Sequence, residues 1–180
     1  MKQRLKSVYT VTLVSQYLKN YVNYNTYQVP KLKKIVINQG LGQEGLNSKS
    51  LAKAKKEMTL LCGQKPVVTR SKKAISAFKI KSKAPVGLTV VLRSTKMYAF
   101  LERLITLALP RIRDFRGIEI QSFDGHGNFN LGLENQLMFP EILYDQIEDL
   151  RGMDIAMVTT AKTDPTGLWL LKGFGLPFCN

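Results

Sequence analysis

Two segments with alternating side chains set the strongest limit on how this chain of 180 residues can fold. In residues 85–94 the apolar side chains share one parity, at Val86, Leu88, Val90 and Leu92. The opposite parity carries Thr89, Val91 and Arg93. In residues 31–39, Ile35 and Ile37 likewise oppose Lys34 and Asn38. This period of two predicts strands with one apolar and one polar face, which suits a sheet covered on one side only.

Helical spacing appears between these strands and at the start of the chain. Residues 48–62 carry one apolar stripe, made of Leu51, Ala54, Met58 and Leu61. Asn47 or Ser48 can cap the start of this helix, and Gly63 follows its end. Residues 2–20 predict an amphipathic helix whose inner positions are Leu5, Val8, Val11, Thr12 and Ser15.

Two more helices and two more strands complete the prediction. Ser94 or Thr95 can cap an apolar helix that ends at Pro110. Thr163 or Asp164 can cap the last helix, and its remaining signals are Pro165 near the first position and Gly173 just past the end. Residues 65–70 and 153–161 read as strands.

The order of these elements predicts the fold class. Strand, helix, strand, strand, helix and strand form the split βαβ order of ferredoxin-like folds. We therefore expect an α/β fold of the α+β type, with a mainly antiparallel sheet and helices on one face. A single domain over residues 1–180 is expected, with an N-terminal helix and connector over 1–27 and a protruding basic loop over 71–84.

The charge balance favours a polyanionic partner. Lys and Arg number 27 against 13 Asp and Glu, which gives a net charge of +14. Nucleic acid is the first candidate and an anionic membrane surface the second. No apolar run approaches the roughly 20 residues that span a bilayer. Cys62 and Cys179 are isolated, so neither a disulfide framework nor a zinc site is expected. The N-terminus has no apolar signal core and lacks the composition of a transit peptide, so we expect synthesis in the reducing compartment where the protein works.

A glycine pattern, Gly40-x-Gly42-x-x-Gly45, imitates a dinucleotide-binding fingerprint. Such a site needs an acidic residue about 20 positions further on, and residues 60–84 contain neither Asp nor Glu. The helix also begins too late for its N-terminus to meet a pyrophosphate. We therefore expect no cofactor, only a strand-to-helix turn with positive φ, in which Gly45 is incidental.

Residues 123–132 (FDGHGNFNLG) give no catalytic or metal site either. The Gly-Lys-Ser/Thr of a P-loop is absent, and Asp124, His126 and Asn128 do not continue into a calcium loop. His126 is the single histidine, and no nucleophile triad surrounds it. The chain is therefore not expected to be an enzyme.

Three segments carry the binding chemistry. The densest has six cations and no acid, at Arg70, Lys72, Lys73, Lys79, Lys81 and Lys83. Ile75 and Phe78 are interleaved and could stack on a base, although a mobile hairpin without a specific partner is the alternative. A second segment, residues 110–117, contains Arg111, Arg113 and Arg116, whose alternative role is a local ion pair with Asp114. The third is the polar turn at residues 63–66.

At these segments the chain resembles the bacterial-type family of large-subunit ribosomal protein five, which binds 5S rRNA. The matching pieces are QVPKLKKIVINQGLG, GQKPVVTRSKKAISAFKIK, PVGLTVVLR, ERLITLALPRIRDFRG, SFDGHGN, FPEI and RGMDIAMVTTAKTD. They keep the family's order from about residue 28 to the C-terminus, whereas residues 7–27 match loosely. Two positions depart from the family, since Val91 stands where a hydroxyl residue is frequent and His126 replaces the usual Arg.

The resemblance implies partners and residue roles. The expected partners are 5S rRNA, adjacent large-subunit rRNA, other proteins of the central protuberance, the tRNA in the peptidyl site and a small-subunit protein. The expected rRNA contacts are Asn38, Gln64, Lys65, Arg70 and Arg93. The expected tRNA contacts are the loop residues Lys72, Lys73, Lys79, Lys81 and Lys83. Arg111, Arg113 and Arg116, with the FPEI segment, are the candidates for the bridge to the small subunit.

Two alternatives and two possible sources remain open at this point. A free RNA-binding regulator of the RRM type shares the strand order, although its exposed aromatic residues are missing from the central strands. An RNA-modifying enzyme would need a catalytic cluster. GLGQ, MYAFLERLITLALP and VTTAKTDPTGLWLLK look closest to cyanobacterial and plastid members. The expected place of work is a ribosome in the plastid stroma, or otherwise in a bacterial cytoplasm.

Overall fold

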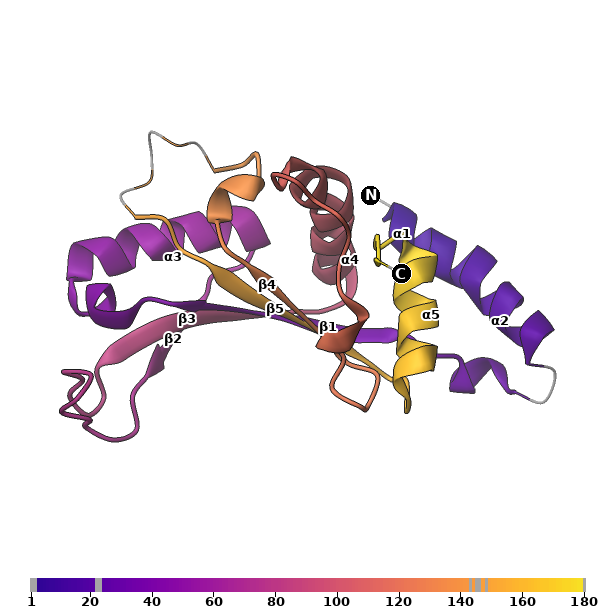
Figure 1. The fold of residues 1–180 in the computed structure, drawn as a ribbon, viewed down its shortest axis with the longest axis horizontal. Coiled ribbons are helices and arrows are strands. Elements are labelled where there is room, and N and C mark those ends of the chain that lie inside the picture. Colours follow the sequence, from indigo (N-terminus) through magenta and orange to yellow (C-terminus); the bar gives the residue numbers. More distant parts are fainter. Residues whose placement is uncertain (1–2, 22–23, 143, 145–146, 148, 180) are drawn as a thin grey trace. The chain divides into compact units, whose positions relative to one another are not determined.

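The computed structural model describes residues 3–21, 24–142, 144, 147 and 149–179. Five strands form one sheet, in the order β2-β3-β1-β5-β4 (Figure 1). Their bounds are Leu32–Gly40 (β1), Val67–Arg70 (β2), Pro85–Leu92 (β3), Phe129–Leu133 (β4) and Met153–Thr159 (β5). The helices are Arg4–Val8 (α1), Val14–Asn20 (α2), Ser48–Cys62 (α3), Ser94–Arg103 (α4) and Asp164–Phe174 (α5).

The sheet is antiparallel, as the sequence predicts. Val67 of β2 pairs with Thr89 of β3, and the register runs in opposite directions from there. The amide of Thr160 donates to the Lys31 carbonyl at 3.0 Å, so the end of β5 meets the start of β1. The α+β class is confirmed. The ferredoxin-like order is not confirmed, because the sheet has a fifth strand, β4, which is not among the strands that the sequence predicts.

Strand β4 escaped prediction because its exposed positions hold residues that rarely mark a strand. Asn130 and Gly132 face outward, while Phe129 and Leu133 are buried. Asn and Gly are depleted in strands, so the alternation is invisible to a propensity argument. The strand is held by packing, since Phe129 is fully buried and lies 4.9 Å from Phe123 between ring centroids.

The N-terminal helix differs from the prediction on its buried side. A π-helical turn, Tyr9–Leu13, joins α1 to α2 in one continuous helix. Leu5, Leu13 and Tyr17 are buried, whereas Val11 is 73% exposed and Thr12 and Ser15 are also exposed. The predicted stripe of Leu5, Val8, Val11, Thr12 and Ser15 is therefore wrong after its first two positions. A regular helix rotates 100° per residue, and the wider π turn changes which side chains follow Leu5 inward.

Two compact units can be distinguished, and the prediction of a single domain stays a prediction. The first contains residues 1–35, 93–131 and 156–180, and the second contains residues 36–92 and 132–155.

In the second unit, α3 packs against β3 and covers one face of the strands (Figure 1). Leu88, Val90 and Ile37 are buried on that face, as their parity predicts. The Asn47 side chain accepts a hydrogen bond from the Lys49 amide at 3.1 Å and caps α3. Its C-terminal cap is Gly63, with φ of 62°. Both predicted caps of α3 are confirmed.

The glycine turn between β1 and α3 confirms one expectation and corrects another. Gly42 has φ of 54°, which favours glycine, and begins a 3₁₀ turn, Gly42–Leu46. Gly45 is not incidental. A Cβ atom at Gly45 would lie 2.7 Å from the carbonyl oxygen of Pro85, so only glycine lets this turn approach β3 so closely.

In the first unit, α5 packs on the N-terminal helix (Figure 1). The predictions for the start and for the end of α5 both need correction. The helix includes Gly173, and its C-terminal cap is Gly175, with φ of 94°. Thr163 precedes α5 without a side-chain cap, and the Asp164 carboxylate accepts a bond from the Gly127 amide at 2.8 Å instead. Pro165 does occupy the first turn.

Helix α4 also starts without the predicted hydroxyl cap. Its first residue, Ser94, has φ of 50°, and the residue at the N-cap position, Arg93, makes no side-chain cap hydrogen bond. The helix continues through a π turn, Leu104–Ala108, and a 3₁₀ turn, Leu109–Arg111. Pro110 therefore lies in the last turn, close to where the sequence predicts the end.

Candidate nucleic-acid interface

One face of the strands in the second unit is not covered by α3, and we call it the open face. Its residues are Asn38, Val67, Thr69, Thr89 and Val91. Asn38 is exposed, as predicted, and Val67 is 66% exposed. The Thr89 hydroxyl donates to the Ile37 carbonyl at 3.2 Å, so its hydrogen is already used. The open face thus offers one amide and apolar surface to a partner, with little charge of its own.

The turn at residues 63–66 supplies polar groups at the end of the open face. The Gln64 side chain donates from Nε2 to the Val91 carbonyl at 3.3 Å. This bond orients the amide and leaves Oε1 as an acceptor for a partner. Lys65 is exposed beside it, while Pro66 is buried and anchors the turn. Asn38 of β1 and the turn residues Gln64 and Lys65 before β2 therefore belong to the same unit, in which β3 lies between these two strands.

The two predicted arginines occupy different surroundings. Arg70 ends β2 and donates from Nη1 to the Lys83 carbonyl at 3.1 Å, so it helps to close the basic loop. Its other guanidinium hydrogens remain available for a phosphate. Arg93 is exposed, directly precedes α4 and belongs to the first unit. Arg93 directly follows the last residue of β3, and its assignment to rRNA stays a prediction.

The basic loop of residues 71–84 is a hydrogen-bonded hairpin. Ile75 and Ile80 exchange two backbone hydrogen bonds of 3.0 and 3.2 Å around a turn closed by the Lys79 amide and the Ser76 carbonyl. At the base, the Ser71 hydroxyl donates to the Lys81 carbonyl at 2.6 Å and accepts from the Ala84 amide. Lys79 and Lys83 have positive φ, of 54° and 62°. These bonds give the loop a defined path rather than that of an unstructured chain.

The lysines of this hairpin face solvent. All five are exposed, namely Lys72, Lys73, Lys79, Lys81 and Lys83. Within the part of the chain that the structure describes, none of them forms an ion pair with a carboxylate. Phe78 is 64% exposed at the turn. An uncompensated cluster of cations with an exposed ring attracts a nucleic-acid backbone and can stack on a base.

The three arginines of residues 110–117 are also exposed. Arg113 lies 3.7 Å from the Asp114 carboxylate, with side chains 98% and 87% exposed. An ion pair so open to water contributes little stability. Arg111 and Arg116 face solvent on the same short connection. The cluster can therefore meet an acidic partner without first losing a strong internal contact.

Hydrogen bonds to Asp124 hold the FDGHGN loop, residues 123–128, in a defined conformation. The Asp124 carboxylate accepts from the amides of His126 and Asn128 and from the Asn128 side chain, at 2.7–3.1 Å. The Asn128 side-chain bond, with the backbone bonds, lowers the pKa of Asp124 below its usual value. His126 is exposed on this turn. Among the described residues, no group of histidine, cysteine and carboxylate side chains is arranged to hold a metal ion.

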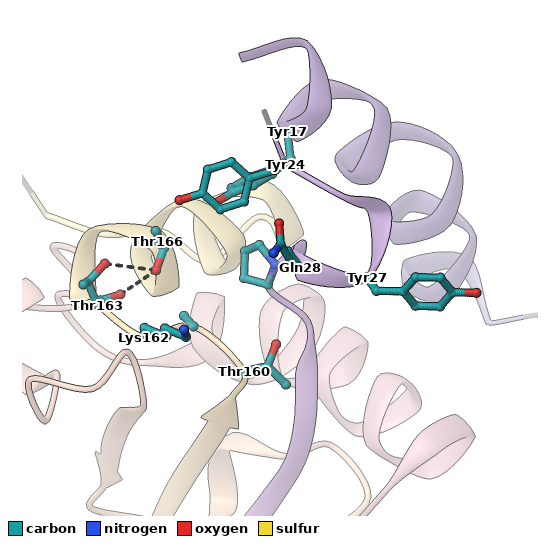
Figure 2. A pocket seen from close by; sticks show the side chains of 10 residues that line it. Tyr17, Tyr24, Tyr27, Gln28, Thr160, Lys162, Thr163 and Thr166 are labelled. Carbon is teal, nitrogen blue, oxygen red and sulfur yellow. Dashed lines mark hydrogen bonds between the residues drawn. The ribbon is translucent and has the colours of Figure 1, made fainter. Parts of the chain in front are cut away.

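A tyrosine-lined pocket in the first unit was not found by sequence reasoning. Tyr17, Tyr24 and Tyr27 line one side, and residues 160–163 line the other (Figure 2). A signal for it is present in residues 21–30, YVNYNTYQVP, which follow the predicted N-terminal helix. Its three tyrosines in seven residues could have indicated an aromatic surface.

The described helices include none that is long and apolar enough to cross a bilayer. A basic α+β protein with exposed cations on a hairpin and a partly open sheet belongs to the class of polyanion-binding proteins. Two family models match, ribosomal protein L5 over residues 25–81 and the ribosomal L5P family C-terminus over residues 85–178. The chain belongs to the uL5 family of large-subunit ribosomal proteins.

Individual relatives agree over the full length. The chain is 58% identical to large ribosomal subunit protein uL5c of Chlorella vulgaris over 180 residues, which covers 100% of both chains. It is 57% identical to uL5c of Tetradesmus obliquus, with 99% of both covered. It is 54% identical to uL5 of Synechococcus sp. (strain JA-2-3B'a(2-13)), with 100% of both covered. The protein is therefore a structural component of the ribosome and not an enzyme.

Proposed function

We propose that this protein anchors 5S rRNA and the adjacent large-subunit rRNA in the central protuberance. The residues assigned to this contact are Asn38, Gln64, Lys65, Arg70 and Arg93. The observation that carries the proposal is the open face, because Asn38 is presented on it, and Gln64 and Lys65 lie in the turn at its end, on the side of the strands that α3 does not cover. Membership in a large-subunit family supports ribosomal RNA as the partner over a free regulator of the RRM type.

The basic hairpin is assigned to the tRNA in the peptidyl site. Its cations are Lys72, Lys73, Lys79, Lys81 and Lys83. Their exposure and the absence of carboxylate partners among the described residues leave their charge available for phosphates. The hydrogen bonds at Ser71 and between Ile75 and Ile80 hold the hairpin in shape, so reaching a partner costs little ordering entropy.

The arginine cluster of residues 110–117 is assigned to the bridge with a small-subunit protein. Arg111, Arg113 and Arg116 are exposed, and their planar guanidinium groups suit carboxylates. An acidic segment is therefore the expected partner. Other proteins of the central protuberance complete the set of neighbours.

A gel-shift comparison tests the rRNA assignment. We expect the purified protein to bind 5S rRNA more tightly than a transfer RNA or a scrambled RNA of the same length as 5S rRNA, at moderate salt. Equal affinity for all three would contradict the assignment, because charge alone would then explain the binding.

The site of action is proposed to be the plastid ribosome, with a bacterial ribosome as the second possibility. Plastid uL5c proteins and cyanobacterial uL5 proteins are similar to this chain at 52–58% identity. Sedimentation of the endogenous protein checks this. It should travel with large subunits from isolated plastids, and recovery with cytosolic ribosomes would contradict the proposal.

A further inference from the structure

The pocket in the first unit is formed by two chain segments that lie side by side (Figure 2). Its volume is about 700 Å³, which is in the range of sites that hold a small ligand. One wall comes from the connection between α2 and β1, with Tyr17, Tyr24, Tyr27, Gln28 and Pro30. The other comes from the connection between β5 and α5, with Thr160, Ala161, Lys162, Thr163 and Thr166.

Internal contacts hold these walls in place. The Lys31 amide donates to the Thr160 hydroxyl, and the Thr160 amide donates to the Lys31 carbonyl, both at 3.0 Å. Tyr17 is 2% exposed and lies 4.9 Å from Trp169 and 5.7 Å from Tyr24 between ring centroids. The pocket therefore exists before any ligand arrives, and binding needs little rearrangement.

The exposed groups of the pocket combine flat rings with positive charge. Tyr24 is 47% exposed, and Tyr27 is 93% exposed at the rim, where its ring extends away from the other side chains (Figure 2). Lys162 is the charged residue among those that line the pocket. The nearby Asp164 carboxylate is turned to the Gly127 amide, and α5 begins here without a side-chain cap. The positive charge of Lys162 is therefore the feature of the pocket that favours an anion.

We propose that this pocket binds one unstacked nucleotide of an RNA chain. Tyr24 stacks on the base, and Lys162 contacts its phosphate. A nucleotide fits both properties of the pocket, because it joins a flat ring to a negative charge. The inference rests on the proposed rRNA-binding function and adds an RNA contact in the first unit, from residues outside those assigned above.

The single tryptophan of the chain, Trp169, provides a reporter that is specific for the pocket. Single-stranded hexa-adenylate and hexa-uridylate should quench the emission of Trp169 in the purified protein. Tyr24→Leu should weaken this binding about tenfold, as expected for the loss of one stacking contact. Lys162→Gln, at an exposed position, should also weaken it and should lower its salt dependence. Tyr144→Leu is the matched control, since Tyr144 is 73% exposed and lies outside the pocket.

Unchanged Trp169 emission in the presence of either oligonucleotide, or equal affinity of Tyr24→Leu and Tyr144→Leu, would overturn the proposal.

A photoreactive diazirine derivative of phenylalanine in place of Tyr27 identifies the molecule at the rim of the pocket in assembled large subunits. An adduct with rRNA supports the proposal. An adduct with a ribosomal protein would mean that a peptide occupies the pocket, and it would overturn the proposal. The gel shift with 5S rRNA is run on each variant. If the wild type binds 5S rRNA selectively but Trp169 emission does not change, only this inference is contradicted. If the wild type binds RNA without selectivity, the proposed function is contradicted.

Discussion

Gly45 shows how a single residue can depend on a contact far away in the chain. Sequence spacing identifies Gly42 as a turn residue, because a strand gives way to a helix there, and its φ of 54° agrees. The need for glycine at position 45 arises from the Pro85 carbonyl of β3. No local pattern contains that information, so the sequence could predict the turn but not the close approach.

Replacing Gly45 by Ala should destabilise the protein by about 1–3 kcal/mol, since the new methyl group collides with a backbone atom that cannot move freely. Gly40→Ala, at the end of β1 just before this turn, is the matched control, because a Cβ atom there meets nothing within 4 Å. Its effect should stay within about 0.5 kcal/mol. Urea unfolding followed by circular dichroism measures both values. Equal stabilities of the two variants would show that the turn relaxes away from Pro85.

Among the elements, the basic hairpin combines features that the sequence shows with features that it hides. The run of lysines and the turn-like centre are visible in residues 71–84. The pairing of Ile75 with Ile80 and the use of the Ser71 hydroxyl at the base are not, because both depend on the register between β2 and β3. The hairpin is therefore better defined than a charge run implies.

The division of labour between the hairpin and the open face can be tested with one quadruple variant. Replacing Lys72, Lys73, Lys79 and Lys81 by Ala should leave incorporation into large subunits nearly intact and should reduce retention of tRNA in the peptidyl site. The control replaces four exposed lysines of the first unit, Lys6, Lys19, Lys96 and Lys172. Sucrose-gradient profiles and filter binding of tRNA are the measurements. A hairpin variant that fails to assemble would instead make this loop an rRNA anchor.

For the whole molecule, the net charge of +14 sets the strength and the salt dependence of RNA binding. Ordinary physical rules could predict this property, together with the alternation of Ile35, Ile37, Leu88 and Val90 that fixes which face is covered. These rules could not predict β4, because Asn130 and Gly132 at its exposed positions are residues that rarely mark a strand. The assignment of Arg93 to rRNA came from the family resemblance, and it stays a prediction.

Salt titration of 5S rRNA binding checks the proposed cationic contacts. With Lys65, Arg70 and Arg93 on phosphates, the plot of log K against log salt should have a slope of about −3 or steeper. Arg70→Gln should make the slope shallower by about 0.9. Filter binding between roughly 50 and 200 mM KCl measures it. A slope near zero for the wild type would mean that base and sugar contacts dominate, and the cationic residues would lose their assigned role.

The π turn at Tyr9–Leu13 has a consequence for comparing chains of different length. Leu5 and Leu13 are eight positions apart and both are buried, a spacing that a regular α-helix would turn by about 80°. At a spacing of seven the same helix returns to within about 20° of its starting direction. A relative with one residue fewer here can therefore bury the same two side chains with ordinary helical geometry. A one-residue gap in this segment is a change of helix type, and an alignment that penalises it as a loop deletion will misplace the residues that precede it.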